Sequence, residues 1–160
     1  MIRTAGAADA PRICEIYNHY IENTVVTFEE TPVTAREIAG RIVEVTRQFP
    51  WLAYEENGAV IGYAYASVWH KRSAYRYSVE STIYLMPGAT GRGVGTKLYG
   101  ALLERLRSPE LHCVIGGIAL PNAGSVALHE KLGFEKVGHL AEIGWKLGRW
   151  VDVGYWQRIL

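Results

Sequence analysis

The fold depends most on residues 77–97, which read YSVESTIYLMPGATGRGVGTK. Tyr77 to Leu85 alternate with the period of a strand, so one face carries Val79, Ser81, Ile83 and Leu85 and the other Ser78, Glu80, Thr82 and Tyr84. A glycine-rich turn follows from Pro87 to Gly93, and a helix then buries a stripe of Val94, Leu98, Ala101, Leu102 and Leu106. The run therefore predicts a strand, a tight turn and a helix.

The glycines of this turn allow backbone N–H groups to converge on an anion at the helix N-terminus. A Walker loop needs glycine directly before lysine, whereas Lys97 follows Thr96. The Rossmann fingerprint also fails, because Thr96 and Leu98 stand where its last glycine is required. The turn by itself is equally consistent with a tight helix-to-sheet contact.

The flanking sequence predicts a mixed α/β domain with a largely antiparallel sheet. Before residue 77 we expect strands at Ile2–Thr4, Trp51–Glu55 and Val60–Trp69, with Asn57-Gly58 as a hairpin turn. Two helices lie between the first two strands, one capped by Asp9 and one opened by the Thr34/Glu37 capping box and ended by Pro50. After residue 106 we expect strands at Val114–Leu120, Phe134–Leu140 and Val151–Ile159, and a helix from Asn122 or Ser125 to Gly133.

Composition points to one soluble domain over residues 1–160. Lys plus Arg number 17 and Asp plus Glu 16, a balance that argues against a broad nucleic-acid surface or a polybasic membrane patch. No apolar run is long enough to span a membrane, and the N-terminus lacks a signal-peptide layout. Cys14 and Cys113 and the histidines show no metal-ligand spacing, so we expect reduced thiols, no metal and a cytoplasmic location.

The glycine turn resembles the pyrophosphate-binding turn of the GNAT superfamily of N-acetyltransferases, (Arg/Gln)-x-x-Gly-x-(Gly/Ala). The matching run is Thr90-Gly91-Arg92-Gly93-Val94-Gly95, in which Gly93 and Gly95 fit. Thr90 replaces the usual Arg or Gln and removes one side-chain contact to the phosphates, although Arg92 or Lys97 can supply charge.

Nearly the whole chain resembles one group of this superfamily, the phosphinothricin and methionine sulfoximine acetyltransferases. The matching segments are Ile16–Tyr20, Thr27–Pro32, Gly62–Ala66, Tyr77–Leu85, Leu120–Asn122, Ser125–Phe134 and Lys146–Gly154. The resemblance implies a central sheet with about four helices and a slot for acetyl-CoA between two splayed strands.

The resemblance also assigns coenzyme-binding positions. Ile83, Tyr84 and Leu85 would pair their backbone with the amide-rich pantetheine arm, as an added strand does. Gly91, Arg92, Gly93, Val94, Gly95 and Thr96 would hold the pyrophosphate, and Asn122 and Ser125 would hydrogen-bond the arm.

Two residues are catalytic candidates. Acetyl transfer to an amine requires the neutral amine, and a peptide α-amino group titrates at roughly 7.7–8.0, so a base is useful. Glu80 is unusual in mid-strand. It is an exposed strand residue, a partner for Arg76 or, as the resemblance implies, the general base, acting directly or through water. His129 lies one helical turn after Ser125 and is either a half-buried helix residue or the acid for the departing thiolate.

The acceptor site is predicted around residues 69–75. Arg72 offers a fork for a carboxylate, with Tyr75 and Phe28 as walls, and Lys146 faces the same pocket or the surface. An ordinary solvated loop cation is the alternative for Arg72. The aromatic run from Trp145 to Trp156 suggests a homodimer surface.

These observations predict an acetyl-CoA-dependent N-acetyltransferase. The expected acceptor is a small amino acid or analogue, such as phosphinothricin, methionine sulfoximine or methionine sulfone, which attacks directly in a ternary complex. One rival is an acetyltransferase for another amine, such as a polyamine, an arylalkylamine or an antibiotic; an acidic pocket would favour it, and Arg72 does not. A second is a non-catalytic acyl-CoA-binding module, which Thr90 favours and Glu80, Asn122 and His129 do not.

Overall fold

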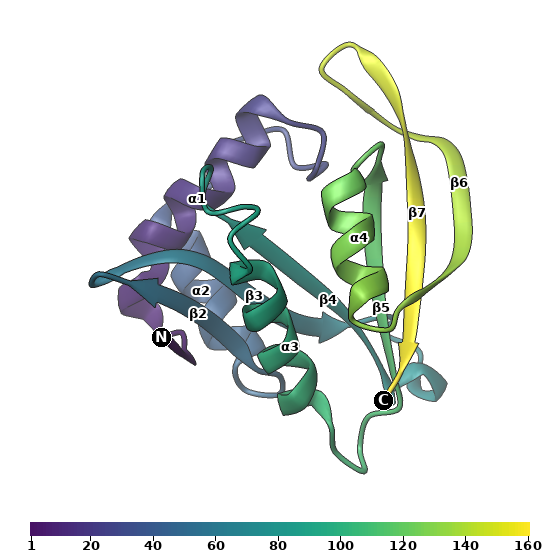
Figure 1. Ribbon diagram of the computed structural model, residues 1–160, viewed down its shortest axis with the longest axis horizontal. Helices are drawn as coiled ribbons and strands as arrows, with labels where there is room; N and C mark the ends of the chain where they lie inside the picture. The colour runs from purple at the N-terminus through teal and green to yellow at the C-terminus, as the bar shows by residue number, and fades with distance from the viewer.

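The computed structural model describes all residues, 1–160, as one mixed sheet with helices on both faces (Figure 1). The strands are β1 (Ile2–Thr4), β2 (Trp51–Glu56), β3 (Ala59–Val68), β4 (Ser78–Leu85), β5 (Cys113–Leu120), β6 (Glu135–Lys146) and β7 (Arg149–Ile159). The helices are α1 (Ala10–Asn23), α2 (Ala35–Val45), α3 (Val94–Leu106) and α4 (Ala123–Lys131), with short 3₁₀ turns at Ala7–Asp9 and Ser73–Tyr75. The predicted order of elements is confirmed.

The seven strands form one sheet in the order β1-β2-β3-β4-β5-β7-β6. Every neighbouring pair is antiparallel except β4 and β5, which are parallel. Parallel neighbours need a crossover connection, and α3 supplies it here. The glycine turn follows the carboxyl end of β4, which is the end away from the residues that pair with β5.

Strands β4 and β5 pair over only three residues each, Ser78–Glu80 with Cys113–Ile115, and then diverge. Figure 1 shows the two strands spreading apart toward the end of the molecule where α1 and the β6–β7 turn lie. The slot between splayed strands that the resemblance implies is present in the fold.

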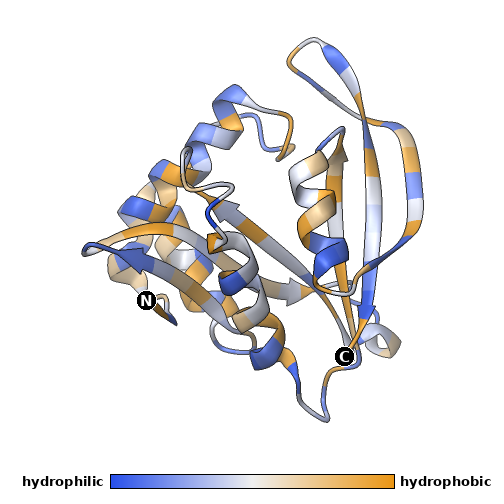
Figure 2. Ribbon diagram, in the orientation of Figure 1, coloured by the Kyte–Doolittle hydropathy of each residue, from blue (hydrophilic) through white to orange (hydrophobic).

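Apolar faces of the helices hold the layers together. Helices α1 and α2 pack on one face of the sheet with Trp51, Ala53 and Tyr63, while α3 packs on the other with Leu52, Ala64 and Val114. Hydrophobic and hydrophilic segments alternate along α1 in Figure 2, as expected for a helix with one buried face. No helix is long and apolar enough to cross a membrane.

Local signals behave largely as expected. Asn57 and Gly58 both adopt positive φ in the hairpin turn, and Gly88, Gly91 and Gly93 do so in the glycine turn. Thr34 and Glu37 form the capping box of α2. The Asp9 side chain caps differently: it accepts from the Gly6 N–H and from Arg3, and makes no capping bond to α1.

Two predicted boundaries are wrong. Helix α2 ends at Val45 and a short turn leads to Phe49, so the helix stops well before Pro50. Strand β6 continues to Lys146 instead of ending at Leu140. Its pairing with β7 shifts between Leu140 and Gly144, where Glu142 adopts positive φ, so a bulge breaks the alternation expected of a strand.

Candidate active site

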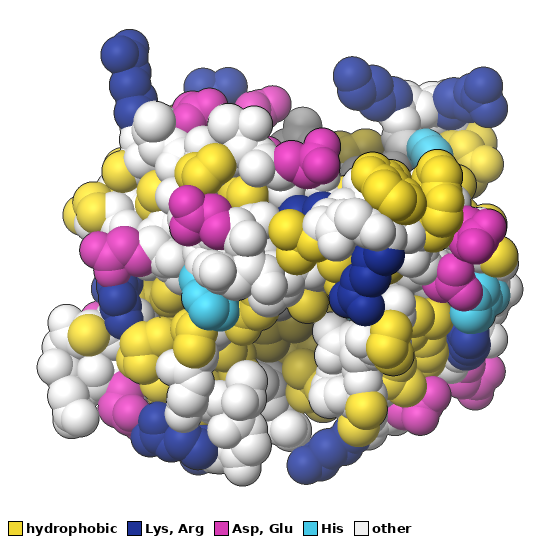
Figure 3. Space-filling view, turned by 90° about the horizontal axis from the view of Figure 1, so that it is seen from above, with side chains coloured by type: hydrophobic (Ala, Val, Ile, Leu, Met, Phe, Trp, Pro, Cys, Tyr) yellow, Lys and Arg dark blue, Asp and Glu magenta, His cyan; other side chains and the backbone are white.

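A cavity of about 380 Å³ lies where β4 and β5 diverge. It is lined by β4 residues from Glu80 to Tyr84, by Gly117, Ile118 and Ala119 of β5, by Asn122, Ser125 and His129, and by Val26, Thr27, Phe28, Ile143, Val153 and Tyr155. Figure 3 shows a hollow between the two halves of the molecule, with hydrophobic side chains at its floor. Seven predicted site residues thus meet in one cavity: Phe28, Glu80, Ile83, Tyr84, Asn122, Ser125 and His129.

The open edge of β4 presents unpaired backbone groups to this cavity. Met86 donates its N–H to Ile61 of β3 at 2.8 Å. The backbone N–H and C=O groups of successive residues point to opposite sides of a strand. Those of Ile83 and Leu85 therefore point away from β3, into the space between β4 and β5. The Tyr20 hydroxyl donates to the Leu85 carbonyl at 2.6 Å, which leaves Ile83 free to pair with an extended ligand.

Glu80 sits at the point where β4 and β5 separate. Burial raises the pKa of its carboxyl, and the charge of nearby His70 partly opposes that effect. A Cβ built on Gly117 would lie 3.5 Å from Glu80 Oε1 and 3.3 Å from the Tyr155 ring, so glycine leaves room beside the carboxylate. Arg76, the alternative partner predicted for Glu80, instead lies over the Tyr77 ring.

His129 is buried between aromatic rings. It is only 4% exposed, and its ring centroid lies 5.0 Å from that of Tyr99 and 5.1 Å from that of Phe134. Its Nδ1 lies 2.7 Å from the Ser125 carbonyl oxygen; since a carbonyl only accepts, Nδ1 carries the proton and Nε2 is the free nitrogen. Burial lowers the pKa of the imidazole, which favours its neutral form.

Asn122 and Ser125 are brought together at the start of α4. The Asn122 Oδ1 accepts the Ser125 N–H at 3.1 Å and caps the helix. Of the two predicted caps, Asn122 is the one used. Both residues line the cavity, where the Ser125 hydroxyl lies 3.5 Å from His129 Nδ1.

The glycine turn leads directly into α3, with Gly93 as its N-cap at φ 79°. The first N–H groups of a helix have no partner within it, so those of Val94, Gly95 and Thr96 are available to an anion. A Cβ on Gly95 would lie 3.3 Å from Leu128, so α4 packs closely against the first turn of α3. Arg92 is engaged elsewhere: it forms a salt bridge with Glu56 at 2.8 Å.

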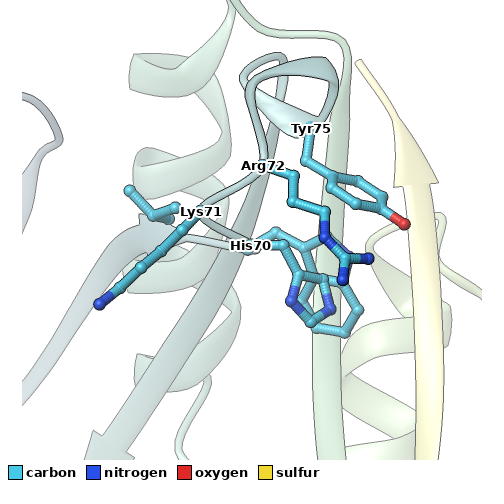
Figure 4. Close-up of a pocket in the computed structure, with 6 residues that line it drawn as sticks. His70, Lys71, Arg72 and Tyr75 are labelled. Atoms are coloured by element: carbon cyan, nitrogen blue, oxygen red, sulfur yellow. The ribbon is translucent and has the colours of Figure 1, made fainter.

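A second cavity of about 630 Å³ lies beside the first. Val68, Trp69, His70, Lys71, Arg72 and Tyr75 line it. In Figure 4 the side chains of His70, Arg72 and Tyr75 gather on one side of the loop, while Lys71 points away. Trp69 lines this cavity and Tyr155 lines the other, and the centroids of their rings lie 5.7 Å apart. Arg72 forms no salt bridge.

Lys146 is not a surface residue, because it is only 3% exposed. It lines neither main cavity; its ammonium donates to the Thr27 carbonyl at 2.8 Å. Burial lowers its pKa, and Glu30 and Glu29 oppose that effect. Phe28, by contrast, lines the cavity that contains Glu80.

Sequence reasoning missed several residues of the site. Tyr155 and Ile143 line the cavity from β7 and β6, and Tyr99 and Ser81 hydrogen-bond at 2.7 Å beneath His129. Only the pair Gly116-Gly117, glycines within a strand, carried a signal, because such glycines often mark a close approach of other groups.

These features match what acetyl-CoA requires: an open strand edge for the amides of its pantetheine arm and a helix N-terminus for its pyrophosphate. No group of three His, Cys, Asp or Glu side chains is placed to hold a metal ion.

Comparison with known families identifies the class of protein. Residues 2–154 match the family model described as an acetyltransferase (GNAT) domain, and the chain belongs to this family of acetyl-CoA-dependent N-acetyltransferases. Among curated proteins it is 43% identical to a phosphinothricin N-acetyltransferase of Streptomyces viridochromogenes, over 98% of this chain and 86% of the relative.

Two further relatives agree with this assignment. An L-methionine sulfoximine/L-methionine sulfone acetyltransferase of Pseudomonas aeruginosa is 39% identical over 98% of this chain and 92% of its own length. The crystal structure of a GNAT superfamily phosphinothricin acetyltransferase from Sinorhizobium meliloti, in complex with acetyl-CoA, superposes with a TM-score of 0.96 at 42% identity. That alignment covers 100% of this chain and 88% of the other.

Proposed function

We propose that residues 1–160 form one domain that acetylates the amine of a small, carboxylate-bearing amino acid or analogue. The observation that carries this proposal is the meeting of Glu80, the open edge of β4 and the start of α4 in one cavity. The names of the relatives support phosphinothricin, methionine sulfoximine and methionine sulfone as the first acceptors to test.

Glu80 is the proposed general base. Burial raises the pKa of the Glu80 carboxyl toward the pKa of the ammonium group of the acceptor. The carboxylate deprotonates this group directly or through a water. The neutral amine then attacks the thioester carbonyl in a ternary complex. Neither cysteine is a candidate for a covalent step, since both are buried and Cys14 is hydrogen-bonded to the Val33 carbonyl.

Two groups are assigned to the charge that develops during transfer. The unpaired N–H of Ile83 is the proposed donor to the oxyanion. The free Nε2 of His129 is the proposed proton carrier: the neutral imidazole takes up the proton that the attacking nitrogen loses once it has bonded to the acetyl carbon, and passes this proton to the departing thiolate.

The acceptor is proposed to lie across both cavities, with its amine near Glu80 and its carboxylate toward Arg72. A guanidinium without a protein partner is well suited to bind a carboxylate. Tyr75 and Phe28 are the proposed walls.

The test is thiol release from acetyl-CoA in the presence of a panel of amines: the three acceptors above, common amino acids, polyamines and aromatic amines. Turnover of the amino acid analogues alone supports the proposal. Preference for polyamines or aromatic amines would contradict it, and acetyl-CoA binding without turnover of any amine would indicate a binding module.

We further propose a homodimer formed through the β6–β7 hairpin. This hairpin carries several large apolar side chains that are 42–59% exposed: Val137, Leu140, Ile143, Trp145, Leu147 and Trp150. Exposed apolar patches of this kind mark association surfaces. The two free thiols, Cys14 and Cys113, support a proposed cytoplasmic location.

A further inference from the structure

Lys146 is a buried cation whose contact is with the backbone of a distant loop. Its ammonium donates to the Thr27 carbonyl across 119 residues of sequence, and it forms no salt bridge. A buried charge is costly unless it is hydrogen-bonded, so the hydrogen bond to Thr27 offsets part of the cost of burying this ammonium. Lys146 is the last residue of β6, whereas Thr27 belongs to the loop between α1 and α2.

The segment held by Lys146 is a wall of the Glu80 cavity. Val26, Thr27 and Phe28 all line that cavity. The side of the loop nearest the helices is already fixed: the Tyr17 hydroxyl lies 2.8 Å from Thr27 Oγ1, and Arg41 grips both oxygens of Glu29 at 2.7 and 2.9 Å. On the opposite side, Lys146 is the hydrogen-bonding tie to the β6–β7 hairpin.

Beside this tie, β6 makes room for the Phe28 ring. A Cβ built on Gly144 would lie 2.4 Å from two ring carbons of Phe28, so any larger residue would displace the ring. Ile143, next to Gly144 in the bulge, lines the same cavity. Residues 143–146 thus contribute one cavity wall, a seat for Phe28 and an anchor for Thr27.

We propose that Lys146 is a positioning residue for the acceptor, holding the Thr27 backbone so that Phe28 stays seated against Gly144 as a wall of the acceptor site. This inference rests on the proposed function, because the wall matters only if an amine acceptor binds beside Glu80. In this proposal Lys146 positions the wall of the site and does not itself contact the substrate.

The first test is Lys146→Met, which keeps most of the side-chain volume and removes the hydrogen bond. We expect KM for the acceptor to rise about tenfold with kcat nearly unchanged, since the ordering of the binding wall is lost. The affinity for acetyl-CoA, measured by calorimetry, should not change. The matched control is Lys131→Met at the exposed end of α4, which should leave all three values unchanged.

A second measurement reads the loop directly. Amide hydrogen exchange in residues 24–33 should accelerate in Lys146→Met and in Gly144→Ala, while exchange in α3 and β5 stays at the wild-type rate. This readout does not depend on knowing the acceptor. If wild-type protein acetylates no amine, the proposed function fails, and exchange alone decides whether Lys146 holds the loop.

Two results would overturn the inference. The first is that Lys146→Met has the same KM for the acceptor as the wild type and the same rate of hydrogen exchange in residues 24–33. The other is a parallel fall in kcat, acetyl-CoA affinity and melting temperature, which would indicate a general role in stability.

Discussion

Glu80 combines two properties at the scale of one residue: it is half-buried, and it lies where the sheet opens. Burial raises its pKa above the ordinary value of 4.5. In the wild type, kcat/KM should therefore fall on acidification with a midpoint above that value. Glu80→Gln should lower kcat/KM by about 100-fold or more, within the range for loss of a general base, and abolish this acid limb. A pH–rate series checks both, and an unchanged limb in the variant would assign the limb to another group.

The same shift predicts an effect on stability. A folded-state pKa above the unfolded one means that the folded protein keeps the proton to higher pH, so stability falls as pH rises from about 4.5 toward the raised pKa. Glu80→Gln stays neutral throughout. The difference in melting temperature, variant minus wild type, should therefore be more positive at pH 8 than at pH 4. Thermal unfolding at both pH values measures this, and an equal difference at both would contradict the shift.

Arg72 and Lys71 are adjacent cations that point to opposite sides of their loop (Figure 4). Arg72→Ala should raise KM for carboxylate-bearing acceptors by roughly tenfold or more, because a charge-assisted pair is lost, and should leave KM for acetyl-CoA unchanged. Steady-state kinetics with both substrates varied gives the two values. Arg36→Ala, at an exposed cation of α2 that lines neither cavity, is the control, and equal effects of the two changes would remove Arg72 from the acceptor site.

At the scale of elements, β5 and α4 approach so closely that a side chain between them is excluded. A Cβ on Gly116 would lie 2.6 Å from His129 Nε2. Gly116→Ala should destabilise the fold by about 1–3 kcal/mol through overpacking, and should weaken acetyl-CoA binding because α4 must shift. Chemical denaturation and calorimetry measure the two effects.

Gly100 on α3 provides the control for that substitution. A Cβ there meets nothing within 4 Å, and its backbone is helical, so Gly100→Ala should stabilise the protein by about 0.5–1 kcal/mol. A destabilising Gly100→Ala, or a neutral Gly116→Ala, would contradict this account of the β5–α4 contact.

At the scale of the whole molecule, the β6–β7 hairpin is the least covered part of the sheet. Trp145 and Trp150 are 55% and 59% exposed and form an edge-to-face pair with centroids 5.0 Å apart. If the hairpin joins two copies, the wild type should sediment as a dimer, and Trp145→Ser/Trp150→Ser should sediment as a monomer. Val43→Ser, at an exposed apolar residue of α2, is the control. A monomeric wild type or a dimeric double variant would exclude this interface.

Much of the fold was predictable because its signals are local. The Thr34/Glu37 box, the Asn57-Gly58 turn and the glycines after β4 act within a few residues, and each produced the expected structure. The β6 bulge was not predictable, since Glu142 at positive φ is held by Asp152 from the neighbouring strand, which accepts its N–H at 2.8 Å. The hydrogen bond to a residue of the neighbouring strand overrides the alternation of residues that the sequence of β6 itself indicates.

The candidate site divides in the same way. Sequence motifs brought attention to Glu80, Asn122, Ser125 and His129, because their types and spacing resemble a known pattern. Folding determined what surrounds them: the separation of β4 from β5, the proton on His129 Nδ1, the position of Glu80 and Tyr155 beside Gly117, and the burial of Lys146 against Thr27. Local sequence sets which groups are available, whereas burial and distance arise from segments far apart in the chain that meet only when the sheet and its helices pack.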